Sequence, residues 1–181
     1  MQKKKIINLS GITLLLIAII FFILSILFRE YFQSLFEGKV ENYGLFAFFF
    51  LVLLLEIIPQ YVSPHFLMLN AKIIGIPLLS LTVVAVIAHT LSSVIGFYLG
   101  KRFGLKFVNS LYEKRKVIDI SKKMEKHGKW IVLASAFLPL PYVPIIFGSL
   151  DLSWRTFTFY GIIPRGISFI LLGILIFFIG I

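Results

Sequence analysis

Two charged side chains interrupt stretches of sequence that otherwise carry no charge. Glu56 follows the uncharged residues 44–55, and Arg165 lies within residues 156–181. If these stretches lie in a membrane, each charge should be paired, protonated or turned inward. We expect Glu56 to be a proton-coupling or substrate-gating acid, unless it lies at the interface near a hairpin mouth. We expect Arg165 to pair with Glu56 or hold an anionic headgroup, the alternative being that it snorkels to the cytoplasmic interface.

His89 lies in the middle of a third uncharged stretch, residues 73–99, and Ser93 follows one helical turn later. Two interpretations stay open for His89, a titrating group in a proton path or a neutral ring bonded to a backbone carbonyl. The three histidines are far apart and have no adjacent carboxylates. H-E-x-x-H, G-x-S-x-G and P-loop motifs are absent from the sequence. We therefore expect no metal, no cofactor and no enzymatic activity.

The composition excludes a water-soluble globular enzyme. Of the 181 residues, 59% are hydrophobic and 14% are charged, and there is no cysteine to staple a secreted domain. The net charge is +10, which in so apolar a chain indicates loops facing anionic lipid rather than a nucleic-acid site. The sequence predicts one all-α integral membrane domain over residues 1–181, with membrane lipids, especially anionic headgroups, as partners.

Three stretches are long enough to cross a bilayer as helices: residues 6–28, 73–99 and 156–181. The first follows three lysines; we interpret it as a retained span, because its apolar part is too long for a signal peptide and no cleavage site follows. The other two carry small residues at helical spacing, which predicts close-packing seams and allows a homo-oligomer through them. These small residues are Ala88, Ser92, Gly96, Gly100 and Gly104 in one span and Gly166, Gly173 and Gly180 in the other.

Two further apolar blocks, residues 44–71 and 130–150, are broken by prolines. Proline removes a backbone donor and interrupts a helix, so neither block predicts a simple span. We predict two re-entrant helical hairpins, with one kinked span over 44–69 as the alternative for the first. The turns are marked by Pro59 and Pro64 in the first block and by Pro139, Pro141 and Pro144 in the second.

The distribution of positive charge predicts the orientation. Lys3–Lys5 place the N-terminus in the cytoplasm, and the basic, amphipathic residues 101–129 should lie on the same side of the plasma membrane. This holds only if residues 44–71 enter and leave on one face. The predicted architecture is therefore three full transmembrane helices and two opposed re-entrant hairpins, in an inverted-repeat-like arrangement.

Several short motifs resemble the DedA superfamily, also called the SNARE-associated or VTT-domain family. Residues 95–104 are similar to its aromatic-glycine-basic helix ending, and residues 126–129 leading to Phe137–Pro139 resemble its entry into the second hairpin. Gly148 followed by Phe157 and the acidic Glu56 match further positions, so the resemblance covers about residues 44–175. Where the family usually has arginines around the second-hairpin proline, this chain has Ala136 and Tyr142.

The resemblance implies movement or scrambling of phospholipids or polyprenyl phosphates, with a link to the proton-motive force. We therefore expect a lipid transporter or scramblase, with proton coupling through Glu56. Two alternatives stay open: a membrane scaffold assembled through the glycine seams, and a small-ion or proton transporter.

Overall fold

The computed structural model describes residues 43–57, 63–111, 114–137, 144–150 and 152–180, with a few isolated positions between residues 20 and 34. Every regular element in these ranges is a helix. Most of the predicted first span lies outside the described residues, and so do Pro59, Pro139, Pro141 and Tyr142.

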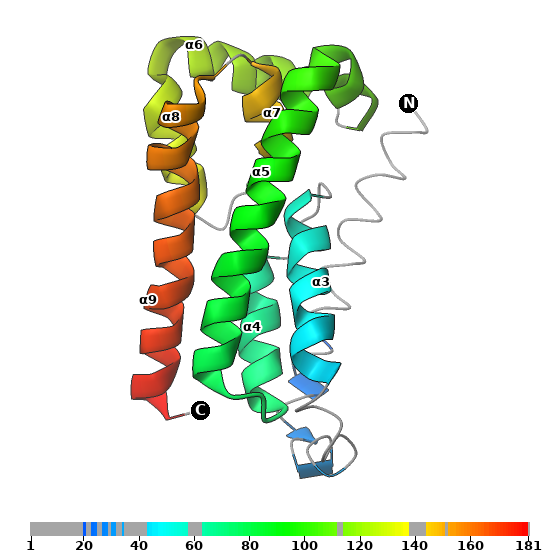
Figure 1. The fold of residues 1–181 in the computed structure, drawn as a ribbon, viewed down its shortest axis with the longest axis vertical. Helices are drawn as coiled ribbons and strands as arrows, with labels where there is room; N and C mark the ends of the chain where they lie inside the picture. The colour runs from blue at the N-terminus through cyan, green and yellow to red at the C-terminus, as the bar shows by residue number, and fades with distance from the viewer. Residues whose placement is uncertain are drawn as a thin grey trace.

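Two long apolar helices form the frame of the molecule (Figure 1). The first is helix α5 (Leu78–Leu111), of which Leu78–Leu105 is apolar enough to cross a membrane. The second, Trp154–Ile179, is continuous through α8 (Trp154–Phe157), the π-helix η2 (Thr158–Ile162) and α9 (Ile163–Ile179). At about 1.5 Å per residue both exceed the roughly 30 Å of a bilayer core. Membrane-spanning length is thus confirmed for the second and third predicted spans.

Helices α3 (Leu45–Ile57) and α4 (Pro64–Ile73) form a pair of half-length elements. They would extend only about 20 Å and 15 Å along their axes. Helix α3 rises from the lower end of the molecule and α4 returns to that end, where α5 begins (Figure 1). Ser63 caps the N-terminus of α4 and Pro64 occupies its first turn, where a missing N–H costs nothing.

Helices α6 (Lys114–Phe137) and α7 (Pro144–Ser149) form the second broken pair. Helix α6 is continuous through residues 129 and 130, where the sequence analysis separated a surface segment from a hairpin. Helix α5 likewise extends beyond residue 99, and it bends at Gly104, whose φ of 66° lies outside the helical region. Within the described residues, the predicted basic segment 101–129 is helical and consists of the C-terminal part of α5 and the larger, N-terminal part of α6.

The glycines of the predicted seams pack against other helices of the same chain. A Cβ on Gly100 would overlap the carbonyl of Ile145 in α7, and one on Gly148 would overlap the carbonyl of Phe97 in α5. A Cβ on Gly173 would lie 2.6 Å from Thr82 Oγ1. Close packing is confirmed for Gly96, Gly100 and Gly173, whereas a Cβ added to Gly104 or Gly180 would have no atom within 4 Å, so the predicted seams do not extend to these two residues. A homo-oligomer through the seams stays a prediction.

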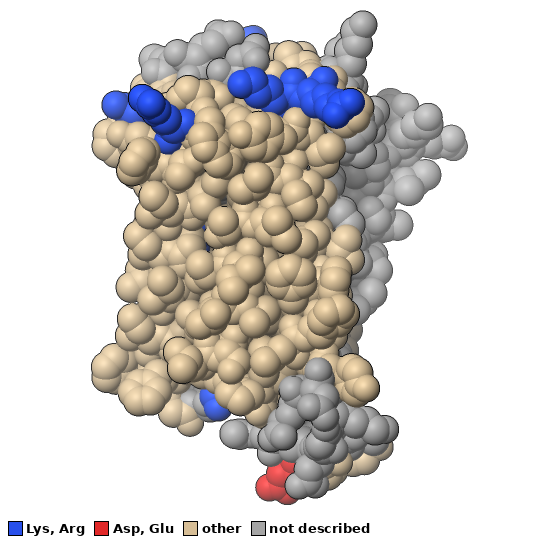
Figure 2. Space-filling view, viewed as in Figure 1, with Lys and Arg blue, Asp and Glu red and all other residues tan. Residues whose placement is uncertain are grey.

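The outer surface is divided into an apolar belt and a positive end. Figure 2 shows a broad tan belt between the two ends of the molecule, with lysine and arginine side chains grouped at the upper end. Among the side chains that the structure describes, the exposed positive ones on the helices at that end are Lys101, Arg102, Lys122, Lys129 and Arg155.

Candidate functional site

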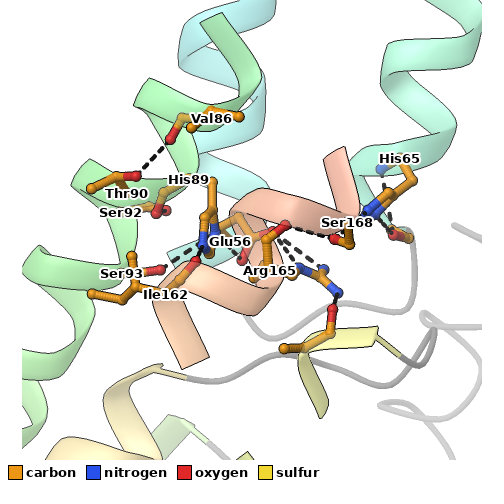
Figure 3. Close-up of polar contacts among 12 residues, drawn as sticks. Glu56, His65, Val86, His89, Thr90, Ser92, Ser93, Ile162, Arg165 and Ser168 are labelled. Carbon is orange, nitrogen blue, oxygen red and sulfur yellow. Dashed lines mark hydrogen bonds and ion pairs between the residues drawn. The ribbon is translucent and has the colours of Figure 1, made fainter. Parts of the chain in front are cut away.

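The two predicted charges meet in the interior of the molecule. Glu56, one residue before the end of α3, and Arg165, in the first turn of α9, are each 3% exposed. Arg165 Nη2 and Nε donate to the same oxygen, Glu56 Oε1, over 3.3 Å and 3.4 Å (Figure 3). Charge-assisted bonds of this kind are usually about 2.7–2.9 Å long. The pair is thus buried but loosely bonded, and Arg165 does not extend to the surface.

Arg165 also contacts the second broken helix pair. Its Nη1 donates to the carbonyl of Ala136 over 3.2 Å. Ala136 lies in the last turn of α6, where carbonyls have no partner within the helix and carry partial negative charge. One guanidinium therefore joins the C-terminal ends of α3 and α6, the two helices that lead into the breaks.

His89 in α5 is fully buried and connects Glu56 to the π-helix. Its Nε2 lies 3.3 Å from the carbonyl of Ile162, the last residue of η2, and Ser93 Oγ lies 3.4 Å from its Nδ1. Because a carbonyl only accepts, the proton is assigned to Nε2. The contact with a backbone carbonyl is present, while Nδ1 lies 3.6 Å from Glu56 Oε2, so both interpretations of His89 stay predictions.

Glu56 Oε2, the second oxygen of the carboxylate, faces His89. It lies 3.6 Å from His89 Nδ1 and, within the described part of the chain, accepts no hydrogen bond. Two unprotonated acceptors cannot bond each other, but one proton on either atom would supply the missing donor. Arg165 keeps its charge in all conditions. The three groups can therefore exist with a net charge of zero or, after one proton enters, of plus one.

A second polar group borders the first on the α4 side. His65 Nε2 lies 3.0 Å from Ser168 Oγ, and Ser168 donates to the carbonyl of Arg165 over 2.6 Å. Because the single hydroxyl proton of Ser168 is used there, His65 Nε2 is the donor of the first bond. The His65 ring stacks on Phe169 with 4.2 Å between the ring centroids. The other neighbour of Phe169 is His89, whose ring centroid lies 5.8 Å from that of Phe169.

The structure brings Glu56, His89, Ser93 and Arg165 into one cluster (Figure 3). Pro64 and Pro144 each begin a helix after a break. Sequence analysis missed His65, Ser168 and Phe169, although the last two follow Arg165 at helical spacing on one face. It had no means of finding the carbonyls of Ala136 and Ile162, because backbone atoms have no letter in the sequence. Among the described residues no group of three metal-ligating side chains occurs.

The chain resembles known sequences over most of this architecture. It is 26% identical over 133 residues to an uncharacterized protein of Methanocaldococcus jannaschii, a match that covers 72% of this chain and 80% of that protein. No solved structure matches it. Residues 58–176, which include His89 and Arg165 but begin two residues after Glu56, match the VTT domain. With most of its length inside that match, and with two helices long and apolar enough to cross a bilayer, this membrane protein belongs to the VTT-domain (DedA, SNARE-associated) family.

Proposed function

We propose that this protein moves the headgroup of an anionic lipid, a phospholipid or a polyprenyl phosphate, across the bilayer together with a proton. The observation that carries the proposal is the buried guanidinium of Arg165, held between Glu56 and the Ala136 carbonyl where two helices end. A guanidinium fork matches the oxygens of a phosphate as well as those of a carboxylate. Glu56 thus occupies the position on Arg165 that a phosphate would take.

The proposal includes a topology. Three full spans, the first within residues 6–28, would place the N-terminus in the cytoplasm at the plasma membrane. The pairs α3–α4 and α6–α7 would be re-entrant hairpins from opposite faces. This is supported by the half-membrane lengths of α3 and α4 and by the contact of Arg165 with the ends of both α3 and α6. Helix ends at mid-depth are where transporters bind polar substrates.

The charge balance of the cluster explains why a proton and an anion would move together. With Glu56 ionised, its charge offsets that of Arg165 and the buried site is neutral. A proton on Glu56 or His89 leaves one uncompensated positive charge in the interior, which is strongly unfavourable. A phosphate of single negative charge removes that excess. Proton and headgroup are therefore expected to enter the site together and to leave together.

A transport assay with purified protein in phosphatidylcholine vesicles tests this proposal. Fluorescent phosphatidylglycerol or polyprenyl phosphate is followed by chemical bleaching of the outer leaflet, with labelled phosphatidylcholine as the comparison. We expect the anionic lipids to cross faster than phosphatidylcholine, and faster still in the direction of an imposed proton gradient. Wild-type vesicles in which no anionic lipid crosses would refute the function.

Three variants separate binding from release. Glu56→Gln mimics the protonated acid, so it should retain headgroup binding but lose translocation, because Arg165 has no carboxylate to return to. Arg165→Ala should lose both. Removing one partner of a buried pair costs about 3–5 kcal/mol in folding stability, so the double variant Glu56→Gln/Arg165→Gln is the folding control. It carries no buried charge and should fold like the wild type without moving lipid; translocation at the wild-type rate would contradict the proposal.

The contact between His89 Nδ1 and Glu56 Oε2 also favours a second candidate, proton transport without lipid. Proton flux in vesicles of neutral lipid alone, abolished by Glu56→Gln, would support this candidate instead. Substitution of the seam glycines is a poor test of the scaffold alternative. Gly96 and Gly173 pack against other helices of the same chain, so their substitution would affect folding as well as assembly.

A further inference from the structure

A cavity opens on the positive end of the molecule, away from the Glu56–Arg165 cluster. Its volume is about 490 Å³, and it is lined by Arg155, Thr156, Phe159 and Tyr160. The Lys129 ammonium, which comes from α6, lies 5.7 Å from the centre of the Tyr160 ring. Cations at this distance are attracted to the face of an aromatic ring. One positive side chain, Arg155, therefore lines the cavity, and a second, Lys129, lies against an aromatic ring that lines it.

Both cations are available to a ligand. Arg155 and Lys129 are exposed, and neither takes part in the ion pairs found among the described residues. The cavity is shallow and open, so it would hold a headgroup at the surface rather than enclose a whole small molecule. An arginine fork, a lysine charge and a neighbouring tyrosine make a typical set of phosphate-binding groups. The cavity is thus suited to a phosphate monoester or diester.

An apolar strip continues from the cavity along the outside of the helix. Phe159 is 66% exposed, and four of the exposed apolar side chains after it follow at intervals of three or four residues, which places these on one face. These side chains are Phe159, Ile163, Ile167, Ile170 and Ile174. The strip follows α9, which runs from the end of the molecule that carries α6 and α8 toward the opposite end (Figure 1). A ligand with a phosphate in the cavity could therefore lay a hydrocarbon chain on this strip.

We propose that this cavity binds one anionic glycerophospholipid of the adjacent leaflet, with its phosphate between Arg155 and Lys129 and an acyl chain along α9. The charge of the cavity and the apolar strip together select a lipid over a soluble phosphate. The site is separate from the Glu56–Arg165 cluster, and it does not depend on the proposed translocation.

The chain's own tryptophans report on this site. It has only two, Trp130 beside Lys129 and Trp154 beside Arg155. Full-length protein is placed in vesicles in which brominated phosphatidylglycerol or brominated phosphatidylcholine replaces ordinary lipid, and the quenching of tryptophan fluorescence is measured. We expect phosphatidylglycerol to quench at about a tenfold lower mole fraction than phosphatidylcholine, a difference of roughly 1.4 kcal/mol.

A charge-matched pair of variants distinguishes a site from general attraction. Arg155→Gln/Lys129→Gln should abolish the preference for phosphatidylglycerol. Lys101→Gln/Arg102→Gln removes the same charge from the same end of the molecule, at α5, and should keep the preference. All four side chains are exposed, so both variants should fold. An equal loss in the two variants, or no preference in the wild type, would overturn the proposal.

Two further measurements fix the ligand and separate this proposal from the transport function. Glycerophosphoglycerol, the soluble headgroup without acyl chains, should fail to relieve the quenching at millimolar concentration; relief would replace the lipid with a soluble phosphate and overturn the proposal. Glu56→Gln should lose translocation but keep the preference for phosphatidylglycerol. A loss of preference in Glu56→Gln would contradict a separate site.

Discussion

Glu56, His89 and Arg165 come from three helices, and each makes a different kind of interaction within the cluster. Arg165 offsets the charge of Glu56, Glu56 faces the unprotonated nitrogen of His89, and His89 is oriented by the carbonyl of Ile162. A buried group of this kind is stable only while every member has a partner. Its members should therefore respond differently to substitution, according to whether the change removes a charge, a proton site or a hydrogen bond.

His89→Gln tests the proton site. A glutamine amide can donate to the Ile162 carbonyl as Nε2 does, but it cannot take up a proton near neutral pH. We expect the variant to fold and to lose the acceleration of lipid movement by a proton gradient. The measurement is the vesicle assay with and without the gradient. A gradient response equal to that of the wild type would show that His89 has no part in the coupling.

His65→Phe tests the second polar group. Phenylalanine can keep the stacking on Phe169, but the hydrogen bonds of the His65 ring to Ser168 and Ser63 are lost. We expect a loss of about 1–3 kcal/mol in stability, the usual net value of two such bonds, with translocation retained. Thermal unfolding followed by circular dichroism measures the first and the vesicle assay the second. Complete loss of transport in a folded His65→Phe variant would place His65 in the transport mechanism.

The side chains of the Glu56–Arg165 cluster could be predicted from the sequence because polar residues in apolar stretches need a partner. Glu56, His89 and Arg165 are recognisable in this way, and so is the option that Glu56 and Arg165 pair. The carbonyl partners could not be predicted, since they depend on where helices end and how they pack. His65 was considered only as a metal ligand and set aside, because the three histidines are far apart in the sequence.

At the scale of helices, the contact between α5 and α7 is limited by glycine. Gly100→Ala would push a methyl group into the carbonyl of Ile145, whereas Gly128 in α6 has no atom within 4 Å of an added Cβ. We expect Gly100→Ala to lower stability by at least 2 kcal/mol, roughly the upper range for overpacking. Gly128→Ala should raise it by about 0.5–1 kcal/mol, since alanine favours the helix. Equal thermal unfolding midpoints for the two variants would contradict the close packing.

Pro64 and Pro144, the two predicted turn prolines that the structure describes, each begin a helix, because the missing N–H of proline acts locally. The boundaries within the basic region were predicted less well. Charge marks the end of an apolar stretch, but it does not end a helix, so α5 and α6 continue through lysines and arginines. The π-helix η2 was not predicted, because its hydrogen-bond pattern depends on packing against neighbouring helices as well as on its own residues.

At the scale of the molecule, the proposed topology assigns each exposed position to one side of the bilayer. The chain has no cysteine, so single cysteines can be introduced without a background. Tyr43→Cys and Lys72→Cys, at the outer ends of α3 and α4, should react with a membrane-impermeant maleimide from one side. Lys129→Cys and Arg155→Cys should react from the other side. Tyr43→Cys and Lys72→Cys on opposite sides would mean that residues 44–69 cross the membrane fully.

The π-helix has a consequence for the whole molecule that reaches beyond its five residues. A π turn accommodates one residue more than an α turn, and each residue advances an α-helix by about 100°. Phe157 before η2 and Arg165 after it both face the interior. In an uninterrupted α-helix one of these two side chains would be rotated about the helix axis by roughly a quarter turn relative to the other, and it would then face the acyl chains. The additional residue in the π turn therefore restores the rotation of the helix, so that Phe157 before the turn and Arg165 after it are both buried.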